Sequence, residues 1–381
     1  MEFRDLKKQY QILKPQIDKA MLDVAASCGF IGGKQVSELE QKLAEYAGVK
    51  HCITCGNGTD ALSLMMMAWG IGAGDAVFVP TFTFFASAEI VSFAGAEPVF
   101  VDIDERTFNI DCDSLEKQIC KVEQEGRLNP KAVVAVDLFG QPADYPRIQA
   151  ICKAHNLLLL EDGAQGFGGR IGEQKACSFG DAATTSFFPA KPLGCYGDGG
   201  AVFVNDDEIA EHLRSLRVHG KSPVSKYDNI RIGVNSRLDT IQAAILLVKL
   251  EAFKANELDG VNWAAKRYTE ELGNLVVTPL VKEGFYSSWA QYSILLESRE
   301  ERNALQAGLK EKGIPSMIYY PKPMHLQTAF QDLGYKEGDF PTAESICGRV
   351  IALPMHPYLE DAQIKEVSTA VREILTQFRN K

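Results

Sequence analysis

Short, almost wholly apolar runs alternate with longer segments of helical periodicity from about residue 50 onward. Such runs are typical of strands that are covered on both faces of a sheet. The pattern therefore predicts an α/β fold, with a large domain in which helices cover a mostly parallel, mixed sheet. Seven strands are expected, at residues 51–55, 76–80, 97–103, 131–139, 156–162, 184–188 and 200–205.

A long segment at residues 240–260 has apolar positions at helical spacing, and Asp239 is a candidate N-cap for this helix. Past about residue 275 the pattern changes to that of a smaller α+β unit. We expect a large domain at residues 1–250, N-terminal helix included, and a small C-terminal domain at residues 251–381. Because no Gly/Ser linker separates them, the two should pack together.

Charge and hydropathy argue against several classes of partner. The net charge is −10 and no basic tract offsets it, so we expect no nucleic-acid partner. Residues 1–16 carry charges throughout, unlike a signal peptide. The longest apolar runs fall well short of the ~20 residues of a membrane-spanning helix. We therefore expect a cytoplasmic protein with no membrane partner.

The nine cysteines are scattered singly, apart from Cys52 and Cys55 on the first predicted strand. A lone Cys-x-x-Cys lacks the second pair of ligands that a structural zinc site needs. We therefore expect buried free thiols and no metal site.

The segment at residues 56–60, Gly-Asn-Gly-Thr-Asp, follows a predicted strand and opens a helix. Backbone N–H groups at a helix start can hold a phosphate, aided here by the Thr59 hydroxyl and by glycines such as Gly58 that allow close approach. A simple capped turn between strand and helix would have the same sequence. Both interpretations stay open at this point.

Three further candidates follow predicted strands. Asp162 ends the strand at 156–162, where open parallel sheets place ligand-binding residues, and its carboxylate suits a protonated ring nitrogen. Phe84 follows the strand at 76–80, and Lys191 lies in a glycine-rich loop after the strand at 184–188. A Schiff-base lysine needs a phosphate site, an acid and a flat side chain over the cofactor ring. The alternatives are a structural loop carboxylate at Asp162 and an ordinary solvated loop at Lys191.

Asn235, Ser236 and Arg237 immediately precede the long predicted helix. Hydrogen-bond donors beside a helix N-terminus form an anion site, and a capping turn is the alternative. Taken alone, this segment favours neither.

These motifs occur together and in order, and the chain resembles the DegT/DnrJ/EryC1/StrS family of sugar aminotransferases. The likeness extends from residues 30–33 (Phe-Ile-Gly-Gly), through the segments above, to residues 353–357 (Leu-Pro-Met-His-Pro). The resemblance implies the fold type I of PLP-dependent transferases, as in aspartate aminotransferase. It also implies pyridoxal 5′-phosphate (PLP) as cofactor and a homodimer with active sites shared between subunits.

The resemblance assigns roles around the cofactor ring. Lys191 would bind PLP covalently and act as the catalytic residue, and Asp162 would pair with the pyridine nitrogen. Gln165 would hydrogen-bond the ring hydroxyl, and Phe84 would stack on the ring. Residue 163 is Gly where the family usually has Ala, so we expect a looser backbone there.

The resemblance also implies which residues bind the cofactor phosphate. Gly58, Thr59 and Ser186 would bind it from one subunit, and Asn235 would reach it from the neighbouring subunit. His219 matches a family position near the site, but no role for it follows from the sequence.

Residues 185–200 and 232–240 look most like the branch that aminates UDP-linked 3-keto-uronates with glutamate as donor. The expected product is UDP-2-acetamido-3-amino-2,3-dideoxy-glucuronate, for bacterial surface polysaccharide such as the lipopolysaccharide O-antigen. Arg237 would bind the uronate carboxylate in a bidentate manner. Tyr320 and His325 would help enclose the nucleotide-sugar, although a packed turn between two prolines explains that segment equally well.

Two alternatives follow. One is the same reaction on another nucleotide keto-sugar, such as a dTDP-3-keto or UDP-4-keto sugar. The other is a non-catalytic protein that binds PLP or a nucleotide-sugar as a sensor. A lysine at position 191, where some family members carry the histidine of dehydratases, favours transamination.

Overall fold

The computed structural model describes residues 1–225 and 227–380. Its α-helices are α1 (Leu6–Ser27), α2 (Lys34–Ala47), α3 (Gly58–Ala68), α4 (Ala86–Phe93), α5 (Cys112–Glu125), α6 (Tyr145–Ala154), α7 (Asp207–Leu216), α8 (Thr240–Ala252), α9 (Leu258–Leu272), α10 (Arg299–Glu311), α11 (Pro341–Arg349) and α12 (Asp361–Arg379). Its strands are β1 (His51–Cys55), β2 (Asp75–Pro80), β3 (Glu97–Val101), β4 (Asn129–Val136), β5 (Leu158–Asp162), β6 (Arg170–Ile171), β7 (Gln174–Lys175), β8 (Ala182–Ser186), β9 (Gly200–Val204), β10 (Phe285–Tyr286), β11 (Tyr292–Leu295) and β12 (Val350–Leu353).

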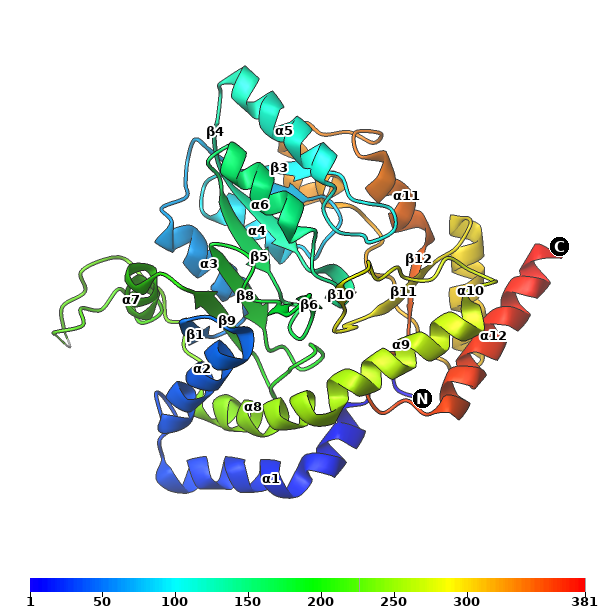
Figure 1. Cartoon of the computed structure of the whole chain (residues 1–381), viewed down its shortest axis with the longest axis horizontal. Coiled ribbons are helices and arrows are strands. Elements are labelled where there is room, and N and C mark those ends of the chain that lie inside the picture. Colours follow the sequence, from blue (N-terminus) through cyan, green and yellow to red (C-terminus); the bar gives the residue numbers. More distant parts are fainter. Residues whose placement is uncertain (226, 381) are drawn as a thin grey trace.

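A seven-stranded sheet forms the centre of the molecule (Figure 1). Its strand order is β1-β9-β8-β5-β4-β2-β3. Every pairing from β8 to β3 is parallel, and β9 is antiparallel to both of its neighbours. The predicted α/β architecture with a mostly parallel, mixed sheet is therefore confirmed, and all strands except β9 end at the same edge.

The seven predicted strands all exist, but four of them, β3, β4, β8 and β9, end earlier than expected. β4 stops at Val136. Asp137 N still donates to Asp162 O of β5 at 3.1 Å, but the next two backbone N–H groups donate to side chains instead of a neighbouring strand. Leu138 N donates to Asn109 Oδ1 at 2.9 Å, and Phe139 N donates to Gln165 Oε1 at 2.7 Å. β3 ends at Val101, directly before Asp102.

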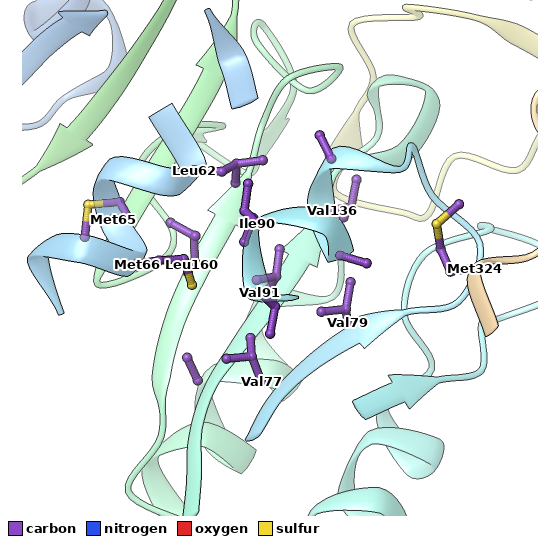
Figure 2. Close-up of a cluster of buried hydrophobic side chains, with 14 of the residues drawn as sticks. Leu62, Met65, Met66, Val77, Val79, Ile90, Val91, Val136, Leu160 and Met324 are labelled. Atoms are coloured by element: carbon purple, nitrogen blue, oxygen red, sulfur yellow. The ribbon is translucent and has the colours of Figure 1, made fainter. Parts of the chain in front are cut away.

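Both faces of the sheet are apolar, as the sequence pattern requires. Along β2, Val77 and Val79 belong to a cluster with α3 and α4, whereas Phe78 packs on the other side with residues of α5 and α6. Figure 2 shows the first cluster, in which Leu62 and Ile90 from the two helices lie over the strands. The sheet is thus fixed from both sides, and its strand ends are rigid supports.

The predicted long helix is interrupted. α8 runs into a π turn, Phe253–Glu257, and then into α9, so the boundary proposed after residue 250 falls within one helical run. Asp239 occupies the N-cap position, but its side chain makes no capping hydrogen bond, contrary to expectation. α9, the last part of this run, packs with α10, α12, β11 and β12 around a separate apolar cluster.

α1 lies alongside α8 on the outside of the molecule (Figure 1). Leu13 and Ile17 of α1 are buried there against Ile245 of α8. Within the described residues, no helix combines the length and apolar character that crossing a membrane requires.

Candidate active site

The carboxyl ends of β2, β5 and β8 place the main candidate residues at one edge of the central sheet. β5 and β8 are direct neighbours, and Asp162 is in register with Thr184, two residues before Ser186. Phe84 follows β2, and Lys191 lies in the loop after β8. Residues far apart in the sequence thus meet because their strands are parallel.

The start of α3 packs directly against the end of β8. A Cβ atom on Gly58 would lie 2.7 Å from Ser186 Cβ, so only glycine allows this approach. Asn57 caps the helix by accepting a hydrogen bond from Asp60 N at 2.8 Å, which aligns the first turn. Gly58, Thr59 and Ser186 therefore form a cup with helix N–H groups and hydroxyls, suited to a phosphate.

Asp162 is a buried carboxylate, only 4% exposed, at the end of β5. Its Oδ2 accepts a hydrogen bond from Ser87 Oγ at 2.7 Å, and its Oδ1 accepts one from Ala164 N at 3.2 Å. Burial raises the pKa of Asp162, while Ser87, Ala164 and the charge of Lys191 lower it. Asp162 is thus oriented by two donors and suits a protonated ring nitrogen.

Lys191 lies in a tightly folded loop. Its N–H donates to Phe188 O at 2.8 Å, and a Cβ on Gly194 would clash with Pro189 O at 2.5 Å. Burial lowers the pKa of the Lys191 amine, the charge of Asp162 raises it, and the charge of Arg4 lowers it. The environment favours the uncharged amine that a nucleophile needs.

Gln165 is oriented by two hydrogen bonds. Its Oε1 accepts from Phe139 N at 2.7 Å, and its Nε2 donates to Tyr320 OH at 3.1 Å. The second N–H of the amide remains to serve a ring hydroxyl. Tyr320 therefore lies beside a predicted cofactor residue, which places it at the site.

Phe84 is 54% exposed, which is unusual for a phenylalanine next to a sheet core. Its ring centroid lies 6.4 Å from that of Tyr320. An exposed aromatic ring beside Tyr320 is what stacking on a planar cofactor requires.

The segment Asn235 to Arg237 is attached to the start of α3 in the same chain. Ser236 Oγ donates to Asp60 Oδ2 at 2.6 Å and accepts from Gly56 N at 2.9 Å. Ser236 is buried, whereas Asn235 and Arg237 on either side of it are exposed. Both exposed side chains remain available for a ligand or for another subunit.

His325 lies in the core and not on an open surface. Its Nδ1 is 2.7 Å from Thr81 Oγ1, and its Nε2 is 3.0 Å from Glu344 Oε1. The residue is 1% exposed, and burial lowers its pKa. With both ring nitrogens engaged, His325 has no free group for the predicted contact with a nucleotide-sugar.

The backbone at Gly163 is not loose, contrary to expectation. Its N–H donates to Thr184 O at 2.9 Å, and its carbonyl accepts from Thr185 Oγ1 at 3.0 Å. A Cβ there would meet Cys177 Sγ at 2.9 Å. Glycine at position 163 thus leaves room for Cys177, whose sulfur atom occupies the space next to the place where a Cβ would lie.

Two functional candidates were missed by the sequence analysis. Ser87 orients Asp162, yet in the sequence it is one more small residue of a predicted helix. Arg4 donates to the Lys191 carbonyl from the N-terminal segment, and nothing in the sequence signals that contact. His219 lies in the segment between α7 and α8, where its N–H donates to Val234 O at 2.8 Å and its carbonyl accepts from Asn229 Nδ2 at 2.8 Å.

The arrangement fits PLP. The cup at Gly58 and Ser186 suits the phosphate, buried Asp162 suits the ring nitrogen, and the exposed ring of Phe84 has nothing of this chain stacked on its face among the described contacts. Lys191 and Asp162 are close enough for their charges to influence each other. The residues present are those needed to hold the cofactor and to bind it covalently.

Two relatives match nearly the whole chain. The UDP-2-acetamido-2-deoxy-3-oxo-D-glucuronate aminotransferase of Pseudomonas aeruginosa is 43% identical over 97% of this chain and 99% of its own. A protein of Geobacillus stearothermophilus named pleiotropic regulatory protein is 44% identical over 98% of both chains.

Solved structures agree with these matches. A DegT DnrJ EryC1 StrS aminotransferase from Brucella abortus has a TM-score of 0.94 and 48% identity, covering 98% of this chain and 99% of its own. NtdA from Bacillus subtilis, solved with bound cofactor PMP, the aminated form of PLP, has a TM-score of 0.87 and 26% identity over 96% of this chain and 82% of its own. The family match itself extends over residues 11–372. The chain thus belongs to the DegT/DnrJ/EryC1/StrS aminotransferase family.

Proposed function

We propose that this PLP-dependent aminotransferase moves an amino group from glutamate to a UDP-linked 3-keto-uronate, forming UDP-2-acetamido-3-amino-2,3-dideoxy-glucuronate. The observation that carries the transfer chemistry is the convergence of Lys191, Asp162 and the cup at Gly58 on one sheet edge. The choice of sugar is supported by the likeness to the Pseudomonas aeruginosa enzyme over nearly the whole chain.

Bound PLP supplies an electron sink for the carbon that loses a proton. Asp162 keeps the ring nitrogen protonated, and Ser87 holds the carboxylate in place for that purpose. Lys191 would hold the cofactor covalently until the amine of glutamate takes its place. The freed Lys191 amine would then act as the base that accepts the proton from Cα of the donor and as the acid that returns it. The same residues act in the reverse order on the keto-sugar.

The substrate contacts are proposals for Arg237 and Tyr320. Arg237 is exposed and forms no ion pair with any residue that the structure describes, so its guanidinium is free to bind the uronate carboxylate through two parallel hydrogen bonds. Tyr320 lies next to Gln165 and Phe84, at the edge where the sugar must approach the cofactor. For His325 we propose a positioning role in place of direct contact, since it joins Thr81, just after β2, to Glu344 of α11.

We also propose a homodimer in which Asn235 reaches the phosphate cup of the partner. The segment between α7 and α8 projects from the body of the chain (Figure 1). Its exposed apolar side chains favour burial against a second copy. They are Val224, Tyr227, Ile230, Ile232 and Val234.

A cytoplasmic location and a role in bacterial surface polysaccharide, such as the O-antigen, complete the proposal. All nine cysteines are free thiols, which is typical of a reducing compartment. Cell fractionation tests the location. Loss of the 3-amino-uronate from the polysaccharide of a deletion strain, measured by mass spectrometry, tests the role.

The decisive experiment combines an assay with Lys191→Ala. The wild-type chain should show the absorbance band of PLP linked to lysine, lose it on addition of glutamate, and then aminate the UDP-3-keto-uronate. Lys191→Ala should lack the band and lose at least about 10³-fold in turnover, because nucleophile and proton carrier are the same group. Lys254→Ala removes a partly exposed lysine that pairs with Glu251 and should behave as wild type.

The same assay separates the alternatives. Turnover of a dTDP-3-keto or UDP-4-keto sugar, without turnover of the UDP-3-keto-uronate, would contradict the proposed substrate. The name of the Geobacillus stearothermophilus relative keeps a regulatory, sensor function in view. A band that stays unchanged with glutamate and with other amino donors would favour that sensor.

A further inference from the structure

The N-terminal segment lies against the loop that carries Lys191. Arg4 Nη2 donates to Lys191 O at 2.8 Å and to Pro192 O at 3.3 Å. These two carbonyls belong to the lysine itself and to the next residue. One guanidinium thus binds the main chain at the point from which the lysine side chain starts.

Arg4 is itself held on both sides. Phe3 O accepts a hydrogen bond from Met355 N at 3.0 Å, and the Phe3 ring lies edge-on to Tyr319 at 6.3 Å. On the other side, Asp5 caps α1 by accepting from Lys8 N at 2.8 Å. The position of Arg4 is therefore set by the segment just after β12 and by α1, and not by the lysine loop alone.

The charge of Arg4 also has defined surroundings. Burial, the largest effect, lowers the pKa of Arg4, and the negative charge of Glu257 raises it. Glu257, in the π turn after α8, is 5% exposed and accepts hydrogen bonds from Gln9 Nε2, at 2.8 Å, and from Tyr358 OH. Arg4 remains a cation at neutral pH because a guanidinium is not deprotonated in proteins. Its charge disfavours a second cation at Lys191.

We propose that Arg4 is a positioning residue for the transamination: by binding the carbonyls of Lys191 and Pro192, it fixes the backbone from which the lysine side chain reaches cofactor and substrate. A small displacement of such a group is costly, because the rate depends steeply on the placement of reacting atoms. The inference rests on the chemistry of the family and is independent of which nucleotide-sugar is used.

Three variants test the proposal. Arg4→Gln removes the charge and the planar pair of donors, whereas Arg4→Lys keeps the charge but not the pair. Lys7→Gln is the control, because Lys7 lies on the same segment, its side chain is 83% exposed, and its one ion pair among the described residues is with Glu2. Two measurements apply to each cofactor-free chain: hydrogen exchange of the amides at residues 187–196, and the rate at which added PLP becomes linked to Lys191, as a function of pH.

In Arg4→Gln, the amides of Lys191 and Cys195 should exchange about tenfold faster than in the control, while those of β5 stay unchanged. The linkage rate should fall about tenfold, and its pH midpoint should rise because a nearby positive charge is gone. Arg4→Lys should show faster exchange of the same amides with an unchanged midpoint.

The proposal is overturned if Arg4→Gln exchanges and reacts like Lys7→Gln at every pH, or if β5 exchanges faster to the same degree as the loop. If Arg4→Gln does not unfold cooperatively, Arg4→Lys decides. Faster exchange confined to residues 187–196 supports the proposal, and exchange equal to the control contradicts it. Neither measurement uses a sugar, so a wrong substrate assignment would leave the outcome unaffected.

Discussion

At the scale of single residues, opposing effects act on the pKa of Asp162. Burial raises its pKa, and the hydrogen bond from Ser87 is the first of the effects that lower it. Ser87 in turn lies 3.0 Å from Thr83 Oγ1, so its hydroxyl is oriented as well. The ionised form that is proposed to pair with the ring nitrogen therefore depends on Ser87, which has no proposed contact with a reacting atom.

Ser87→Ala should shift the acid limb of the pH profile of kcat/KM upward. Without the hydrogen bond, the pKa of Asp162 rises further above its ordinary value, so the carboxylate is lost at a higher pH. A bond to a charged group supports a shift of about one pH unit. Ser92→Ala, on the exposed side of the same helix, is the control. An acid limb that coincides with the control would show that Ser87 does not hold the charge.

At the scale of elements, the phosphate cup depends on how closely α3 approaches β8. A Cβ on Gly58 would point at Ser186. The packing at Gly200, at the start of β9, is equally close, since a Cβ there would lie 2.4 Å from Asn57 O. The cup is thus a product of two glycines at an interface between a helix and the sheet.

Gly58→Ala should weaken the binding of PLP about tenfold or more, because the new methyl group must push α3 away from Ser186. Titration of the cofactor-free chain, followed by absorbance, measures this affinity. Gly72→Ala is a fair comparison, since its Cβ would meet only Ala94 O at 3.6 Å. Equal affinities of the two variants would mean that the cup tolerates the methyl group.

Much of the arrangement of strands and helices could be predicted from the sequence, because strands buried on both faces leave an unbroken apolar pattern. The sequence therefore located all seven strands of the main sheet and, with them, the edge where Asp162 and Lys191 lie. The π turn after α8 could not be predicted, since its residues continue the helical pattern. Nor could the burial of His325 or the contact of Arg4, because both depend on partners distant in the sequence.

At the scale of the whole molecule, the proposed homodimer would complete each active site with Asn235 of the partner subunit. Asn235 is exposed, while its neighbour Ser236 is bonded to the start of α3 in its own chain. The projecting segment between α7 and α8 carries the apolar side chains that a partner would cover (Figure 1). Whether Asn235 serves its own chain or the partner is therefore testable by mixing subunits.

Lys191→Ala and Asn235→Ala should each be inactive alone and regain activity when unfolded and refolded together. In a mixed dimer, one site combines an intact Lys191 with an intact Asn235 from the other subunit. Random pairing should restore about a quarter of wild-type activity, as half the dimers are mixed and each has one complete site. Absence of any recovery, with mixed dimers verified by mass, would place Asn235 in the site of its own chain.

The position of β1 has a consequence for synthesis of the chain. β1 is at the edge of the sheet, and its strand partner is β9, so His51–Cys55 cannot pair until Gly200–Val204 has left the ribosome. Until then a nascent chain exposes an apolar strand with two thiols, and contacts this distant in sequence form slowly. Protection of the nascent chain by a chaperone should therefore matter most before β9 emerges, long before the small C-terminal sheet is made.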